Sequence, residues 1–320
     1  MNASRLKYTW PIAVGVALAS LESSPAADQP EAATPIVTVQ NPDPTKRPSL
    51  SVWLEISQSR GEKYPMVAAA FPNVPGLICD SWCYESELEF IEAQALAGGK
   101  LQLRHRVRAQ PQVLIVTTVS PEPGAVEFLA RAELDLDSGD TWPAELLTPN
   151  LCWQLKRATS FRSRPEPYPE FVKRCFIFTE TGRTFLHQTR RRPIPVRPAD
   201  HQYNNPPWVQ MYVGTWQDVP QAGTNSWADY SPDRYTTRVI GTFSRDGKYL
   251  AALANDSAST MCQAWHDCLH NNPQWQPAQA PPEKRVWRLK IYALANNPEA
   301  LLARVNTDFP RAGRGNEPGP

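Results

Sequence analysis

The sequence predicts an all-β fold, a large antiparallel β-sandwich with one short C-terminal helix, and three observations support this class. Several stretches alternate apolar and polar residues with the period of two that a half-buried strand requires. Proline accounts for 33 of the 320 residues, about twice its average usage, and it is tolerated at sheet edges and in turns but not inside helices. Only one stretch has the start signals of a helix.

Three successive strands give the clearest pattern. The first spans residues 101–109 and places Leu101, Leu103, His105 and Val107 on one face. A break at residues 110–112 leads to the second, the β-branched run at 113–119. A turn at residues 120–124 then leads to the third, at residues 126–136. Short turns between consecutive strands predict an antiparallel meander.

Further strands are predicted on both sides of this meander. They lie at residues 50–56, 175–179, 184–188, 209–214, 238–243, 249–254 and 286–292. The tetrapeptide at 180–183 has the composition of a hairpin turn, and Asp246-Gly247 predicts another turn. The single helix begins with Asn297 as N-cap and Pro298 at the first helical position, and continues through residues 299–305.

The ends of the chain differ in composition from the middle. Residues 1–27 resemble a signal peptide, because Arg5 and Lys7 precede an apolar stretch at 10–19 that small residues follow. That stretch is too short to span a bilayer, so the mature chain is expected to have no transmembrane segment. We expect a Pro/Ala-rich linker at 28–48, a single β-sandwich domain at 49–310, a disordered tail at 311–320, and a secreted or periplasmic location.

The predicted location outside the cytoplasm bears on the state of the six cysteines in the sequence. An even number of cysteines in an exported protein indicates disulfide bonds. Cys79 with Cys83, and Cys262 with Cys268, are close enough in sequence to close small local loops. The other two are Cys152 and Cys175.

Charge and missing motifs exclude several classes of function. Lys plus Arg (33) nearly balances Asp plus Glu (32), giving a formal charge of +1, whereas nucleic-acid-binding proteins carry a basic excess. The run Arg190-Arg191-Arg192 is interpreted as a solvated loop. The sequence contains no nucleophile elbow, P-loop, dinucleotide fingerprint or zincin motif, and no cofactor is predicted.

Residues 100–136 resemble the galactose-mutarotase-like supersandwich of many carbohydrate-active proteins. The resemblance rests on residues 101–105, 113–119 and 124–133, about an eighth of the chain, and it is a rhythm of strands. It implies a supersandwich-like fold and a carbohydrate ligand. No active-site motif of that family can be matched here, so it implies no site residue.

Aromatic and polar side chains gather between residues 201 and 275, which contain five of the eleven tryptophans. Sugars present C–H faces to aromatic rings and hydroxyls to amides and carboxylates. The substrate-binding residues predicted on this basis are Trp208, Trp216, Trp227, Tyr230, Asp229 and Asn225. The alternative is that these aromatic rings pack in the core and between the sheets.

The segment 262–272 is the densest polar cluster. For catalysis we predict His266 or His270 as general acid or base, with Asp267 as partner. A further pool of carboxylates for glycoside chemistry comprises Asp80, Glu85, Glu87 and Glu89 around the first cysteine pair, and Asp229, Asp233 and Asp256 in this region. The alternatives are a disulfide-closed structural loop and a metal site. The Cys and His spacing matches no standard zinc pattern, and no metal is predicted.

These observations lead to two functional hypotheses. The first is an exported carbohydrate-binding β-sandwich protein, and the sequence leaves open whether it also processes the carbohydrate. The second is a non-catalytic structural or protein-interaction module of the cell envelope, in which the same aromatics are buried and no deep cleft exists. The sequence carries no signal for the oligomeric state.

Overall fold

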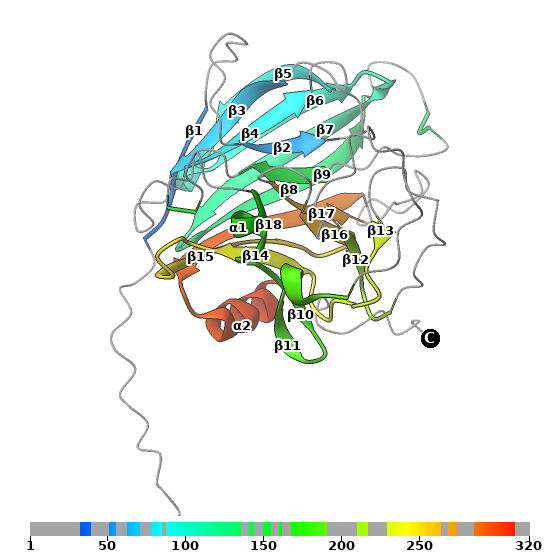
Figure 1. Cartoon of the computed structure of the whole chain (residues 1–320). Helices are drawn as coiled ribbons and strands as arrows, with labels where there is room; N and C mark the ends of the chain where they lie inside the picture. The colour runs from blue at the N-terminus through cyan, green and yellow to red at the C-terminus, as the bar shows by residue number, and fades with distance from the viewer. Residues whose placement is uncertain are drawn as a thin grey trace, which may run out of the picture. The chain divides into compact units, whose positions relative to one another are not determined.

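The computed structural model of the protein consists mainly of β-strands (Figure 1). It describes residues 33–39, 51–55, 63–70, 78–84, 88–135, 141–143, 150–154, 160–161, 168–190, 210–216, 229–263, 268–273 and 285–310. All of these belong to one compact unit, Ala32–Pro320. Within them the strands form two sheets of nine strands each, which confirms the predicted all-β, sandwich-like class.

Sheet A contains strands from both halves of the sequence. Neighbouring strands are antiparallel except for two parallel pairs, β2 with β4 and β12 with β13. In spatial order the strands are β1 (Ile36–Val39), β3 (Lys63–Ala70), β4 (Ile78–Tyr84), β2 (Ser51–Glu55), β9 (Asn150–Gln154), β17 (Cys268–Pro273), β16 (Ala258–Gln263), β12 (Gln210–Val213) and β13 (Asp229–Tyr230).

Sheet B is antiparallel throughout its described pairs. Its last four strands in space follow one another in sequence, so the predicted meander is confirmed. In spatial order the strands are β11 (Gly182–Phe185), β10 (Cys175–Thr179), β14 (Val239–Phe243), β15 (Tyr249–Asn255), β18 (Val286–Ala295), β8 (Ala125–Leu134), β7 (Gln110–Glu122), β6 (Leu101–Val107) and β5 (Leu88–Ala95).

Burial along β6 follows the predicted alternation: Leu101, Leu103, His105 and Val107 are buried, and the residues between them are half-buried. The predicted break at 110–112 falls inside β7, which begins at Gln110 opposite Val107, but the ladder with β6 is irregular there, because Arg106 is already opposite Leu114. The prolines of β7 lie near its two ends, where a missing N–H disturbs the ladder least.

Inward-facing residues of the two sheets form one buried cluster. Tyr212, Met261 and Leu269 of sheet A pack together with Leu253 and Ile291 of sheet B. Burial of apolar surface between two faces is the main stabilising contribution in such a sandwich.

The chain passes from sheet B to sheet A through two residues, Asp256 and Ser257, which join β15 to β16. Buried amides bridge the sheets at this corner. The Asn255 Nδ2 donates to the Asn271 carbonyl at 3.2 Å, and the Asn271 Nδ2 donates to the Leu253 carbonyl at 3.1 Å. Because an unpaired buried amide is costly, these bonds fix how the two sheets meet here.

Helix α2 (Pro298–Asp308) covers the other face of sheet B. Its N-cap is Asn297, whose side chain accepts a hydrogen bond from the Ala300 N–H at 2.9 Å, and Pro298 starts the helix. Leu301 and Val305 pack in a second buried cluster with residues of β10, β14, β15 and β18. The predicted C-terminal helix is confirmed and continues to Asp308. A shorter helix, α1 (Tyr168–Val172), was not predicted.

An ionic cluster lies under the end of α2. The Lys290 ammonium, with a side chain only 1% exposed, is 2.7 Å from Glu122 Oε2, 3.0 Å from Asp308 Oδ2 and 3.8 Å from Glu127 Oε2. Arg288 pairs with Glu127 and donates to the Asp308 carbonyl. Arg304 lies 3.4 Å from Glu122 and 3.6 Å from Asp308. The C-terminal ionic cluster therefore consists of Glu122, Glu127, Arg288, Lys290, Arg304 and Asp308.

Some predicted segments lie outside the described residues, namely the signal peptide at 1–27 and the tail at 311–320. The stretch 28–48, expected to be a linker, contains β1, whose β-branched Ile36, Val37 and Val39 favour a strand. No helix among the described residues is long and apolar enough to cross a membrane.

The structure bears on the cysteine pairs as well. Cys79 and Cys83 lie four residues apart in β4, so their Cα atoms are about 13 Å apart in an extended strand. A disulfide requires Cα atoms within about 7 Å, and this predicted pair is wrong. Cys175 and Cys262 are both buried.

Candidate functional site

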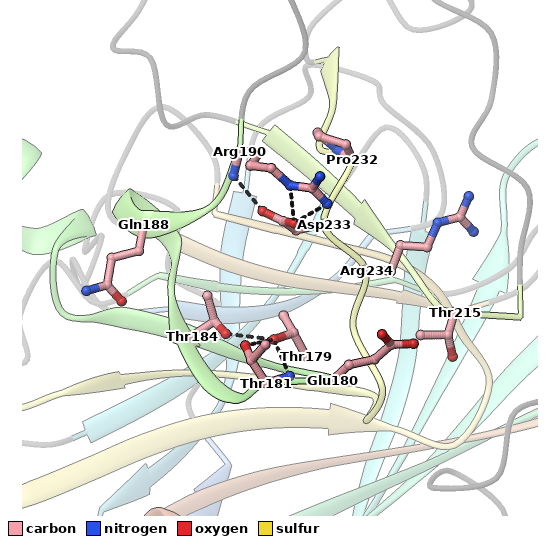
Figure 2. A pocket seen from close by; sticks show the side chains of 10 residues that line it. All are labelled: Thr179, Glu180, Thr181, Thr184, Gln188, Arg190, Thr215, Pro232, Asp233 and Arg234. Carbon is pink, nitrogen blue, oxygen red and sulfur yellow. Dashed lines mark hydrogen bonds and ion pairs between the residues drawn. The ribbon is translucent and has the colours of Figure 1, made fainter. Parts of the chain in front are cut away.

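A pocket of about 530 Å³ opens where edge strands of the two sheets approach each other (Figure 2). The β10–β11 hairpin forms one wall, and the segment that follows β13 forms the opposite wall. The single-turn 3₁₀-helix Leu186–Gln188 and the end of β12 complete it. Its lining is Thr179, Glu180, Thr181, Thr184, Gln188, Arg190, Thr215, Pro232, Asp233 and Arg234.

Three threonines form the floor of this pocket. The Thr179 Oγ1 lies 2.7 Å from the Thr184 Oγ1 and 3.0 Å from the Thr181 Oγ1, so the hydroxyls share hydrogen bonds. The Thr184 hydroxyl also donates to the Gly182 carbonyl at 3.2 Å. Ile177, two residues before Thr179 and on the same face of β10, faces the buried core. The inward face of β10 therefore changes from apolar to hydroxyl-bearing where it reaches the pocket.

The hairpin geometry explains why these threonines converge. Thr179 pairs with Gly182, which leaves Glu180 and Thr181 as the turn. Gly182 has a φ of 93°, in the left-handed region that disfavours any side chain. A glycine just after a two-residue turn is typical of tight hairpins with a bulge. The predicted turn at 180–183 is confirmed.

An ion pair forms the rim of the pocket. The Arg190 Nε lies 2.7 Å from Asp233 Oδ1, and the Arg190 backbone N–H donates to Asp233 Oδ2 at 2.5 Å. The Ser231 hydroxyl donates to the Arg190 carbonyl at 2.8 Å and accepts from the Asp233 N–H at 3.1 Å. The Arg190 side chain is 72% exposed, so the pair fixes geometry more than it adds stability.

The remaining charged groups point in different directions. The Glu180 carboxylate extends toward Thr215, whereas the Arg234 guanidinium points away from the threonines (Figure 2). Arg234 donates to the Gly214 carbonyl at 3.3 Å. Two arginines and two carboxylates line the pocket, so its formal charge is balanced.

Trp216 lies beside the pocket but packs against the core. Its ring meets the Tyr235 ring edge-on at 5.3 Å, and the Arg238 guanidinium stacks over it at 4.8 Å. A Cβ at Gly214 would lie 2.4 Å from the Trp216 ring, so only glycine fits there. Burial lowers the pKa of Arg238 from its ordinary value. These contacts agree with the packing alternative for this tryptophan.

The predicted substrate-binding residues are only partly described. Asp229 and Tyr230 form β13, directly before the segment that lines the pocket, and Trp216 follows Thr215 of the lining. None of these three is among the described lining residues. Trp208, Asn225 and Trp227 lie outside the described residues, as do the predicted catalytic residues His266 and Asp267.

His270, the third predicted catalytic residue, lies in β17. Its neighbours Leu269 and Asn271 are buried toward the core, so His270 faces the other side of sheet A. It is opposite Cys262 of β16 and Cys152 of β9. The described pocket lining does not include it, and its catalytic role stays a prediction.

Of the predicted carboxylates, the structure places Asp233 in the pocket and Asp256 at the corner between the sheets. Burial raises the pKa of Asp256, while the Arg288 N–H, which donates to it at 3.4 Å, acts against that shift. Among the described residues, no group of three or more His, Cys, Asp and Glu side chains is arranged to hold a metal ion.

The sequence prediction missed most of the pocket. Three threonines within six residues around a predicted hairpin turn are a signal that points to a hydroxyl-rich surface. Arg190 was assigned to a solvated loop, and nothing local shows that it meets Asp233, 43 positions away.

Comparison of the chain with protein-family models and with curated proteins finds no match.

Proposed function

We propose that this protein binds a carbohydrate in the pocket between the β10–β11 hairpin and the segment after β13. The observation that supports the proposal is the lining: a cavity of about 530 Å³ whose floor is a cluster of threonine hydroxyls. Small-molecule sites usually have volumes of about 300–1,000 Å³. A sugar presents several hydroxyls in a small volume, and such a lining offers them partners.

The charge of the pocket supports the same ligand class. Two arginines and two carboxylates cancel, so the lining gives no general attraction for a polyanion or a polycation. The rim is already ordered by the Arg190–Asp233 pair and the Ser231 hydroxyl. A site ordered before binding loses little conformational entropy when the ligand enters.

Binding is a better-supported activity than turnover. A glycosidase needs two carboxyl groups across the scissile bond, one of them held as an acid in apolar surroundings. Asp233 forms an ion pair with Arg190, and Glu180 is exposed to solvent. We therefore propose a binding protein, with the resemblance of residues 100–136 to galactose-mutarotase-like proteins as independent support for a sugar ligand.

We also propose that the protein is exported and that residues 1–27 are its signal peptide. The test is N-terminal sequencing of the protein recovered from the culture medium or periplasm. A mature chain that begins near residue 28 is expected. Recovery of the intact N-terminus from the cytoplasm only would refute export.

The experiment for the sugar proposal is a calorimetric titration of the full chain against neutral, amino-substituted and acidic oligosaccharides. Saturable binding of at least one class is expected. Thr184→Val keeps the shape of the floor but removes a hydroxyl, and it should weaken that binding about three- to tenfold. Thr307→Val on α2 is the matched control, because Thr307 is exposed and outside the lining.

The outcomes separate the two functional hypotheses. No binding to any class, by protein that circular dichroism shows to be folded, would overturn the proposal and favour the envelope interaction module. Binding that Thr184→Val and Thr307→Val leave equally strong would place the sugar elsewhere on the molecule.

A further inference from the structure

From the distances between the threonine hydroxyls and the Gly182 carbonyl we infer that the threonine floor accepts hydrogen bonds from a ligand, so that it selects neutral and amino sugars over uronates. This inference rests on the proposed function, because it names the class of sugar for the same pocket. It depends on where the three hydroxyl protons go.

The Gly182 carbonyl only accepts, and two threonine hydroxyls lie within donating distance of it. The Thr184 Oγ1 lies 3.2 Å from it and the Thr179 Oγ1 lies 3.4 Å from it. In the arrangement that we infer, Thr184 donates at the shorter distance, its oxygen accepts from Thr179 at 2.7 Å, and Thr179 accepts from Thr181 at 3.0 Å. All three hydroxyl protons are then used within the protein.

The lone pairs that remain are available to accept hydrogen bonds from a ligand. In this arrangement the Thr179 oxygen is saturated, because it accepts from both the Thr181 hydroxyl and the Thr181 N–H at 3.3 Å. Thr181 keeps two lone pairs and Thr184 keeps one. The Glu180 carboxylate, which accepts only, extends along the same wall toward Thr215 (Figure 2). This side of the pocket therefore offers acceptors.

A ligand must supply hydrogen-bond donors to match these acceptors. Sugar hydroxyls and an ammonium group donate, whereas a carboxylate at the same place would set lone pairs against lone pairs and leave both sides unsatisfied. The cation that would otherwise attract a uronate is directed elsewhere: Arg190 is paired with Asp233, and the Arg234 guanidinium points away from the floor (Figure 2).

The test uses two matched sets of monosaccharides, glucose with glucosamine and glucuronate, and galactose with galactosamine and galacturonate. Competition is followed by saturation-transfer NMR on the full chain at neutral pH. In the set that binds, the neutral and amino sugars should bind about tenfold or more tightly than the uronate. Glu180→Gln should reduce the difference in affinity between the amino sugar and the neutral sugar. Glu299→Gln, at an exposed position on α2, is the matched control.

The failures of the two proposals are distinguishable. A uronate that binds as tightly as its neutral partner, or more tightly, overturns the inferred preference for neutral and amino sugars and leaves the proposed carbohydrate binding intact. An amino-sugar preference that Glu180→Gln leaves unchanged removes Glu180 from the inference. If none of the six sugars binds to the folded protein, the inference is overturned, and the oligosaccharide titration decides separately whether the proposed function stands.

Discussion

The C-terminal ionic cluster gives a direct test of how α2 is held on sheet B. Replacing Lys290 by Met keeps an unbranched side chain of similar length and removes the ammonium. In the native cluster three cations face three carboxylates, so the formal charge is zero; the variant has a formal charge of −1. Because Lys290 is only 1% exposed, water cannot replace the missing charge.

The expected cost follows from the contacts that remain. Removing one partner of a buried ion pair destabilises a protein by about 3–5 kcal/mol. Here Glu127 keeps Arg288, and Arg304 stays 3.4 Å from Glu122 and 3.6 Å from Asp308. We therefore expect Lys290→Met to lower the free energy of unfolding by about 3 kcal/mol, the lower end of that range.

Urea unfolding followed by circular dichroism measures this cost. Lys173→Met is the control, because Lys173 makes a 2.6 Å pair with Glu170 in which both side chains are about half exposed; it should cost less than about 1 kcal/mol. Adding Asp308→Asn to Lys290→Met makes the cluster neutral again, and the double variant should be more stable than the sum of the single effects by about 1 kcal/mol. A Lys290→Met effect as small as that of the control would refute the reasoning.

Three further predictions concern single residues. Gly214→Ala should lower the free energy of unfolding by about 1–3 kcal/mol, because its Cβ would meet the Trp216 ring; an unchanged urea midpoint would contradict this. Asn297→Ala should cost about 1 kcal/mol in the same assay through loss of the α2 N-cap, and no loss would mean that the cap is not formed. Burial lowers the pKa of His105 from 6.5 to about 4, so as the pH falls the unfolded chain takes up a proton at a higher pH than the folded protein does. Between pH 7 and pH 4 the free energy of unfolding of the wild type should therefore fall by about 3 kcal/mol more than that of His105→Leu. Parallel stability–pH curves for these two proteins would show that His105 does not titrate in this way.

Local patterns were sufficient for the elements whose signals lie within a few residues. Period-two alternation predicted the meander β6–β7–β8, the composition of residues 180–183 predicted the β10–β11 turn, and an Asn-Pro pair predicted the start of α2. The boundaries were less accurate: β7 extends over residues placed in a break and in a turn. Strand ends depend on which neighbour continues the ladder, and the local sequence does not show that neighbour.

The candidate site was predicted only in part for the same reason. The sequence indicated the region after residue 201 through its aromatic residues and named Asp233 among several carboxylates. It did not indicate Arg190, which meets Asp233 from 43 positions away, and it offered Trp216 as a sugar platform where the structure packs that ring against Tyr235 and Arg238.

The sequence by itself determined the fold class, because hydrophobic period, proline content and turn residues act over short range and each strand signals its own presence. Only the tertiary structure decided the order of the strands and what meets at the end of the sandwich. The Arg288–Glu127 pair joins residues 161 positions apart, and the pocket combines the hairpin near residue 180 with the segment near residue 233. Such pairings depend on how two faces pack and on which charges are buried together, which are properties of the assembled sheets.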